Sequence, residues 1–218
     1  MKAVIFDLDG TLINSLENIA FCMNSSLKEF EFQEHKVDDF KMFIGEGSYK
    51  LASNSLPAQT SEEMVKNVFN RFIEIYDANI YENTLPYDGI YELLKKLKNT
   101  NLKLGILSNK PHKFTEQFGI KFFRHCGFDE IHGQKENVPA KPHAMGALNI
   151  AKSFDIKPEE IFYVGDSSTD MKTASNAKMK SIGVLWGFRP KEELIQNGAN
   201  YLAKDCKELW EIIDSQRD

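Results

Sequence analysis

Cysteine, long apolar runs and an excess of basic charge are all scarce in this 218-residue chain. The three cysteines stand apart without Cys-x-x-Cys spacing, which argues against a disulfide framework or a zinc site. We expect buried, inert thiols in a reducing compartment, and therefore a cytoplasmic protein. No apolar run approaches the roughly 20 residues that cross a bilayer, and no signal-peptide pattern precedes the first predicted strand. We expect no membrane association.

The charge pattern limits the class of partner. The formal net charge is -5, and no basic stripe follows any predicted helix, so we expect no nucleic-acid partner. An anionic substrate would have to be attracted locally, by a metal ion and a few cations, because the overall field is unfavourable. No feature of the sequence indicates an oligomeric state.

An acidic turn follows the first predicted strand. Residues 3–6 (Ala-Val-Ile-Phe) form an apolar run typical of a strand that is buried on both faces. Asp7 and Asp9 come next, on one face of the chain if it stays extended, and Gly10 allows a turn. Two adjacent carboxylates raise one another's pKa, which favours a bound cation such as Mg²⁺. The alternative is an Asp-Gly turn with no ligand.

The remaining chain divides into a helical stretch and an alternating one. Residues 14–83 read as wholly helical, with predicted helices at 15–30, 37–43, 48–53 and 61–81. Beyond residue 84, predicted strands at 102–107, 161–164 and 181–185 alternate with helices, including one at 142–154 and one at 171–177. This order predicts an α/β fold with a doubly wound parallel sheet. We expect a core domain of residues 1–13 and 84–218, with an inserted all-helical cap domain of residues 14–83.

Three of the predicted strands end in polar residues, after Phe6, Leu107 and Val164. Because the carboxyl ends of parallel strands share one edge of a sheet, the polar residues that follow should converge there. These residues are Asp7, Asp9, Ser108, Asn109, Asp166 and Asp170.

These residue types suit phosphoryl transfer. Asp7 can act as a nucleophile that forms an aspartyl-phosphate, and Asp9 as the acid and base for the leaving oxygen and the water. Asp166 can supply a second carboxylate to a metal ion, with Asp170 orienting Asp166 or a metal-bound water. Ser108 and the backbone amides near Asn109 can donate to phosphate oxygens.

The motif Asp7-x-Asp9-Gly10-Thr11-Leu12 resembles the first motif of the haloacid dehalogenase superfamily. Ser108, Lys141 and the Asp166–Asp170 pair resemble its other three motifs, in the usual order. The resemblance implies a Rossmann-like core with a cap and a Mg²⁺ cofactor. It further implies a metal site formed by Asp7, Asp166 and the backbone carbonyl of Asp9, and a phosphate-binding, catalytic role for Lys141.

Further stretches resemble the phosphoglycolate phosphatase-like branch of that superfamily. They are residues 108–111 (Ser-Asn-Lys-Pro), 163–167 (Tyr-Val-Gly-Asp-Ser) and 186–189 (Trp-Gly-Phe-Arg). Three positions depart from the branch pattern: Asn14 stands in place of an Asp, His143-Ala144 interrupts Lys-Pro-x-Pro, and Lys178 replaces a Gly. None of these changes removes a candidate catalytic group, but each bears on the identity of the substrate.

The leading hypothesis is a Mg²⁺-dependent phosphatase that hydrolyses a small phosphomonoester, phosphoglycolate-like, through an aspartyl-phosphate. The alternative within the superfamily is a phosphomutase similar to β-phosphoglucomutase, which would use the same nucleophile and acid/base pair. A phospho-acceptor receiver module is a candidate of another class, but it would be about half this length and carry no insert. The partner expected in each enzyme reading is a small phosphorylated metabolite.

Two further features are a glycine-rich loop, whose role stays open, and the histidines, for which we expect no metal site. Gly45-Glu46-Gly47 is either a cap loop that touches substrate or a plain connector between helices, since no strand precedes it. The five histidines lack metal-ligand spacing on a common helix, so we expect surface or core side chains.

Overall fold

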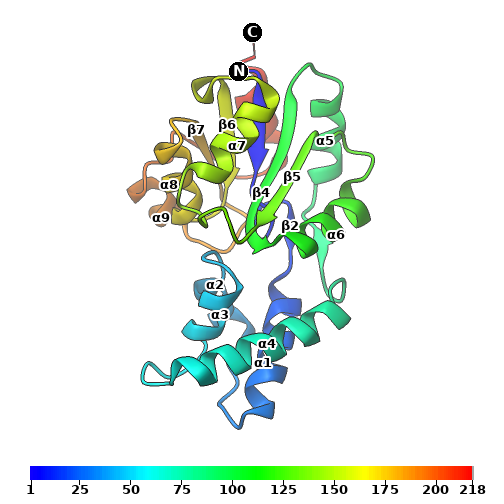
Figure 1. The fold of residues 1–218 in the computed structure, drawn as a ribbon. Helices are drawn as coiled ribbons and strands as arrows, with labels where there is room; N and C mark the ends of the chain where they lie inside the picture. The colour runs from blue at the N-terminus through cyan, green and yellow to red at the C-terminus, as the bar shows by residue number, and fades with distance from the viewer. Residues whose placement is uncertain (218) are drawn as a thin grey trace.

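The computed structural model describes residues 1–217, which are built around a six-stranded sheet (Figure 1). The strand order is β5-β4-β1-β6-β7-β8, and every neighbouring pair is parallel. The strands are β1 (Ala3–Phe6), β4 (Lys103–Pro111), β5 (Glu130–Gln134), β6 (Ile161–Gly165), β7 (Lys180–Val184) and β8 (Tyr201–Ala203). The predicted α/β fold with a parallel sheet is confirmed.

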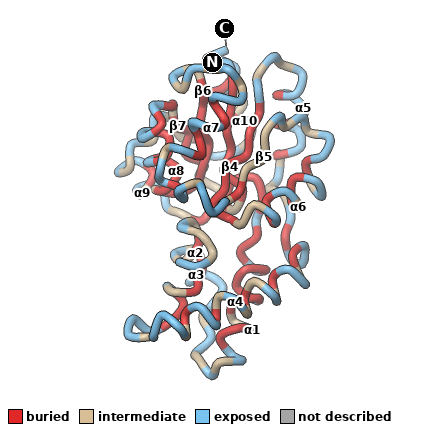
Figure 2. Tube along the Cα trace, viewed as in Figure 1, coloured by how far each residue is buried: buried red, intermediate tan, exposed pale blue. Residues whose placement is uncertain are grey.

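Strand β1 lies in the middle of the sheet, and helices cover both of its faces. Val4 and Phe6 belong to one apolar cluster and Ala3 and Ile5 to the other, and all four are fully buried. A strand with helices on each side has no solvent-facing row, which explains the unbroken apolar run in the sequence. The buried sheet stands out in Figure 2.

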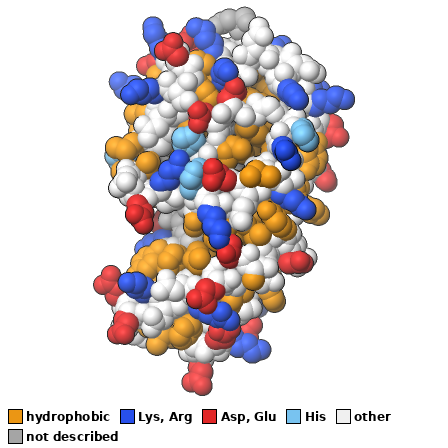
Figure 3. All heavy atoms as spheres, turned by 45° about the vertical axis from the view of Figure 1, so that its right-hand side comes forward, with side chains coloured by type: hydrophobic (Ala, Val, Ile, Leu, Met, Phe, Trp, Pro, Cys, Tyr) orange, Lys and Arg blue, Asp and Glu red, His pale blue; other side chains and the backbone are white. Residues whose placement is uncertain are grey.

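The helices divide between the two faces of the sheet. α7 (Met145–Phe154) and α8 (Ser168–Asn176) contribute to the cluster of Ile5, whereas α5 (Ile90–Lys98), α6 (His112–Phe123) and α10 (Cys206–Asp214) contribute to the cluster of Phe6. α9 (Lys191–Gln196) follows β7 and packs against α8. On the face shown in Figure 3, acidic and basic side chains are interspersed.

Between β1 and β4 the chain leaves the sheet and forms a helical insert. It contains α1 (Leu16–Glu29), α2 (Phe40–Phe43), α3 (Ser48–Asn54) and α4 (Glu62–Ala78), and Figure 1 shows it beyond one end of the strands. The long helices α1 and α4 pack together, and the hydroxyl of Ser26 donates to the carbonyl of Val68 at 2.8 Å. Ser61 caps α4 by accepting from the Met64 N–H.

The two connections to the insert pair with each other. β2 (Ile13–Asn14) and β3 (Leu85–Pro86) form a two-stranded antiparallel ribbon, so the prediction that residues 14–83 contain no strand is wrong at Asn14. A two-residue strand is too short to show any alternation of polar and apolar residues. Close by, the buried Asn18 amide donates to the carbonyls of Asn79 (2.7 Å) and Glu82 (2.6 Å).

Several element boundaries differ from the prediction. β5 and β8 were not predicted, because β5 is half-buried and mixed in polarity and β8 has only three residues. α7 begins at Met145 rather than residue 142, and the helix expected to reach residue 81 ends at Ala78. α8 begins at Ser168 rather than residue 171, because Ser167 and Asp170 form a capping box there.

The remaining expectations concern the state of the three cysteines and the question of a membrane-spanning helix. The three cysteines are free, as predicted, but only Cys22 is buried, while Cys126 and Cys206 are partly exposed. Among residues 1–217, no helix combines the length and the apolar character needed to span a bilayer.

We predict that Asn18→Ala lowers the free energy of unfolding by about 1–3 kcal/mol, because it removes a buried amide that donates two hydrogen bonds to the end of the insert. Urea denaturation followed by circular dichroism measures this loss. Lys28→Ala, an exposed change on the same helix, is the control and should stay within about 0.5 kcal/mol of the parent. Equal stability of the two variants would contradict the prediction.

Candidate active site

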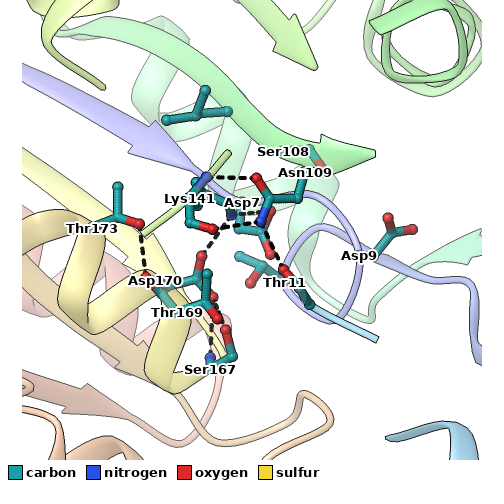
Figure 4. A network of polar contacts seen from close by, with 12 residues as sticks. Asp7, Asp9, Thr11, Ser108, Asn109, Lys141, Ser167, Thr169, Asp170 and Thr173 are labelled. Atoms are coloured by element: carbon teal, nitrogen blue, oxygen red, sulfur yellow. Dashed lines mark hydrogen bonds and ion pairs between the residues drawn. The ribbon is translucent and has the colours of Figure 1, made fainter. Parts of the chain in front are cut away.

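Polar residues from three strand ends meet at one edge of the sheet (Figure 4). Asp7 follows β1, Asp166 follows β6, and Ser108 and Asn109 lie in the last part of β4. Strand β4 is longer than predicted, and its register with β5 shifts between Leu107 and Pro111. The structure therefore brings these four side chains to the same edge, as the strand order requires.

Lys141 lies at the centre of the site. Its ammonium is 2.7 Å from Asp7 Oδ1 and 2.7 Å from Asp170 Oδ1, and the side chain is almost fully buried. Asn109 holds the backbone of Lys141 in place, because Oδ1 accepts from the Lys141 N–H (2.8 Å) and Nδ2 donates to the Lys141 carbonyl (3.0 Å). The Asn109 amide thus positions Lys141.

Three buried carboxylates, from Asp7, Asp166 and Asp170, lie together beside this ammonium, which contacts Asp7 and Asp170. Their oxygens lie within 4.8 Å of one another. Burial, with the neighbouring Asp170 charge next in importance, raises the pKa of Asp7 to about 7. Burial, followed by the charges of Asp170 and Asp7, raises the pKa of Asp166 well above its usual range. When all three carboxylates are ionised, their negative charge exceeds what one ammonium balances, and their hard oxygen donors suit a divalent cation.

Backbone groups hold Asp166 in a tight cradle. Its Oδ2 accepts from the Phe188 N–H at 2.7 Å, and its Oδ1 lies 3.4 Å from the Thr11 hydroxyl. A Cβ at Gly10 or at Gly187 would come within 2.3 Å of Asp166 atoms, so a larger residue at either position would displace the carboxylate. The glycine in the first motif therefore serves close packing as well as the turn.

Asp170 is fixed on both carboxylate oxygens. Oδ1 accepts from Lys141, and Oδ2 accepts from the Ser167 N–H (3.1 Å) and hydroxyl (2.6 Å). Its hydrogen-bond partners are thus Lys141 and Ser167, and its carboxylate lies in the acidic cluster with Asp166. The expectation that Asp170 orients Asp166 or a metal-bound water stays a prediction.

Asp9 points away from this cluster (Figure 4). The chain coils after Asp7, since the N–H groups of Leu12 and Ile13 both donate to the carbonyl of Leu8, so the two acids do not share one face of an extended strand. The Asp9 carboxylate accepts from Lys110 Nζ (2.9 and 3.1 Å) and from the Ser15 hydroxyl (2.5 Å).

Lys110 is a second buried cation that sequence reasoning missed. Its ammonium lies over the ring of Tyr76 at 4.8 Å, and the Asp9 charge helps to raise its pKa although burial opposes the charged form. The signal available in the sequence was its position directly after Ser108-Asn109 at the end of a strand.

A pocket opens between the sheet edge and the insert. Asp7, Asp9, Ser108 and Lys110 form part of its lining. The apolar part of the lining comes from the insert and from α6: Ile19, Ile44, Leu51, Phe72, Tyr76 and Phe114.

The glycine loop of the insert reaches this pocket. Asn109 Nδ2 donates to the Gly45 carbonyl at 2.9 Å, and Gly45 and Gly47 both line the pocket. The contact favours the loop interpretation of Gly45-Glu46-Gly47 over a plain connector. Among residues 1–217, the group of three potential metal ligands that the structure brings together, Asp7, Asp166 and Asp170, contains no histidine.

Comparison with known proteins places this geometry in a family. Residues 4–184 match the family model of haloacid dehalogenase-like hydrolases. The chain is 30% identical to phosphoglycolate phosphatase of Aquifex aeolicus, over 86% of each chain. It is 28% identical to phosphoglycolate phosphatase of Pasteurella multocida, over 98% of each chain.

Solved structures agree in fold over nearly the whole chain. A predicted phosphoglycolate phosphatase from Haemophilus somnus superposes with a TM-score of 0.90 at 26% identity, covering 98% of each chain. A predicted phosphatase from Clostridium acetobutylicum superposes with a TM-score of 0.89 at 28% identity, again covering 98% of each. The resemblance to the phosphoglycolate phosphatase-like branch is thereby confirmed, and the chain belongs to the haloacid dehalogenase-like hydrolase family.

Proposed function

We propose that this hydrolase is a Mg²⁺-dependent phosphatase that cleaves a small phosphomonoester, phosphoglycolate or a close analogue, through an aspartyl-phosphate on Asp7. The observation that carries the proposal is the position of Asp7, whose carboxylate contacts the buried Lys141 ammonium and also lines the pocket beneath the insert. The names of the curated relatives support this choice of substrate.

The reaction divides into two displacements at phosphorus. An oxygen of Asp7 attacks the phosphoryl group, the bond to the substrate oxygen breaks, and Asp9 gives that oxygen a proton. Water then attacks the phosphoenzyme, Asp9 takes a proton from it, and inorganic phosphate leaves Asp7 unmodified. In this proposal Ser108, which lines the pocket, and Lys141, which contacts Asp7, donate to the phosphoryl oxygens throughout.

For this role the Asp9 side chain must move. It is held by Lys110 and Ser15 and faces away from Asp7, so a change of rotamer has to bring it to the leaving oxygen. We infer that this turn accompanies substrate binding, when the pocket between Lys110 and Asp7 is filled.

The acidic cluster fits a magnesium ion by its donor chemistry and by its unbalanced charge. Asp7, Asp166 and Asp170 offer oxygen atoms within 4.8 Å of one another, and one Lys141 ammonium balances only part of their charge. We propose that Asp7, Asp166 and the Asp9 carbonyl hold Mg²⁺, the carbonyl being assigned from the family resemblance. When bound, the ion screens the repulsion between an anionic substrate and Asp7.

We further propose that residues 14–83 act as a cap over a core of residues 1–13 and 84–218. The insert supplies apolar walls that exclude water from the pocket during phosphoryl transfer. These apolar walls offer few partners for sugar hydroxyls, which favours a small leaving group over the sugar phosphate of the mutase alternative. The cytoplasmic location stays a prediction that rests on the cysteine pattern.

We predict that Asp7→Asn lowers kcat for phosphoglycolate by about a thousandfold or more while the protein stays folded, because the nucleophile is lost. Phosphate release and circular dichroism measure the two effects. Asp155→Asn is the matched control, since Asp155 is exposed in a left-handed conformation that Asn also tolerates. Appreciable turnover by Asp7→Asn would remove Asp7 as the nucleophile.

We predict that Mg²⁺ raises the melting temperature of the parent protein but not that of Asp166→Asn. At about 100 times its dissociation constant, a metal bound only to the native state stabilises by about 2.7 kcal/mol. Differential scanning fluorimetry after treatment with EDTA measures the shift, with Asp155→Asn again as the control. An equal Mg²⁺ shift in Asp166→Asn would show that the ion binds elsewhere.

Without divalent ions, we predict that Asp7→Asn becomes more stable relative to the parent as pH rises from 5 to 8. With the native pKa of Asp7 near 7 and the unfolded value near 3.8, the native state keeps this proton longer, so the parent loses stability across that range. The gain should be about 2–3 kcal/mol, because roughly two pH units of this range lie below the native pKa and each is worth about 1.4 kcal/mol. Urea midpoints at the two pH values measure it, and a gain that shrinks toward pH 8 would contradict the assignment.

A further inference from the structure

Two side chains of the sheet domain donate hydrogen bonds to the segment of residues 42–47, which runs from the last two residues of α2 to the start of α3. Arg189 Nη2 donates to the carbonyls of Met42 (3.1 Å) and Ile44 (3.0 Å). Asn109 Nδ2 donates to the carbonyl of Gly45 at 2.9 Å. Arg189 Nη1 also donates to the Met42 sulfur at 2.8 Å. Three of the four acceptors are backbone carbonyls, so the contact depends mainly on where segment 42–47 is placed.

Arg189 is built into the loop that follows β7. Its side chain is only 11% exposed. A charged side chain this far from water normally needs hydrogen-bond or ion-pair partners in the protein. Glu193 lies 3.8 Å from its Nε, beyond hydrogen-bond distance, and already accepts from the Ser168 N–H. The carbonyls of segment 42–47 are therefore the main hydrogen-bond acceptors that the structure gives this guanidinium. One nitrogen, Nη2, donates to both carbonyls, and the other terminal nitrogen, Nη1, donates to the Met42 sulfur.

The same loop is anchored to the acidic cluster. The N–H of Phe188, one residue before Arg189, donates to Asp166 Oδ2 at 2.7 Å. The indole of Trp186 donates to the Thr11 carbonyl at 3.0 Å. In Figure 1 the α2–α3 end of the insert is the part that approaches the loop after β7. Residues 186–189 thus connect the acidic cluster, through Asp166, to segment 42–47, which forms one wall of the pocket.

The wall held in this way belongs to the pocket itself. Ile44, Gly45, Gly47 and Ser48 all line it, and Arg189 contacts the chain at the edge of this group without lining the pocket. Arg189 therefore has no contact with the reacting atoms. Its hydrogen bonds determine where the wall stands relative to Asp7.

We propose that Arg189 is a positioning residue that clasps segment 42–47 over the phosphoryl-transfer site. The kinetic part of this inference rests on the proposed phosphatase function, whereas the structural part does not. Loss of the guanidinium lets segment 42–47 leave the pocket more often, so a substrate finds the complete site less often.

Amide hydrogen exchange followed by mass spectrometry tests the structural part. Arg189→Met keeps the aliphatic stem and removes every donor, and Lys191→Met removes the same charge from an exposed position on α9. Peptides covering residues 40–52 should exchange about tenfold faster in Arg189→Met and at the parent rate in Lys191→Met. Parent-like exchange in Arg189→Met would overturn the proposal, whatever the activity. Arg189→Gln takes its place if the Met variant does not fold.

Steady-state kinetics with phosphoglycolate and Mg²⁺ test the positioning role. Arg189→Met should lose about 10- to 100-fold in kcat/KM, mainly through a higher KM, and Arg189→Lys should recover part of the loss. Faster exchange with unchanged kinetics would overturn the positioning role. Absence of turnover in the parent and in every variant, together with faster exchange in Arg189→Met, would contradict the proposed function and leave the clasp standing.

Discussion

The acidic cluster at the sheet edge is the constraint on which the rest of this molecule depends. Three carboxylates, from Asp7, Asp166 and Asp170, lie out of water with a single ammonium between them. Such an arrangement is costly unless further positive charge or hydrogen-bond donors compensate for it. Protein groups provide part of that compensation, and the remainder accounts for the raised pKa of Asp7. Such an arrangement favours the binding of a cation and an anionic substrate, and it does not favour the stability of the fold.

The surrounding elements serve this cluster in identifiable ways. Strand β1 is buried on both faces, and this packing fixes the position of Asp7 at the carboxyl end of the strand. Asn109 holds the Lys141 backbone, Ser167 holds Asp170, and the Phe188 amide holds Asp166. The insert then covers the cluster with apolar side chains and with the glycine loop. Lys141, Asp170 and Asp166 are therefore each oriented by a neighbour that has no part in the proposed bond-making steps.

Sequence reasoning predicted the fold and the meeting of the acids because both follow from strand order. Short unbroken apolar runs such as residues 161–164 are strong local signals for buried strands. Parallel strands must then bring their carboxyl ends to one edge of the sheet. Strands β5 and β8 were missed because partial burial and short length leave no periodic pattern. The direction of the Asp9 side chain was missed as well, since it depends on a coiled turn and on Lys110, which is distant in sequence. The contacts of Arg189 with the insert are tertiary and leave no trace in local spacing.

A single measurement tests the central claim most directly: acid quenching of the enzyme during turnover of phosphoglycolate with Mg²⁺, followed by peptide mass spectrometry. The account predicts a peptide that contains Asp7 and carries the mass of one added phosphoryl group, located on that side chain by fragmentation. Phosphate release without any such adduct, or an adduct on another residue, would contradict a covalent role for Asp7.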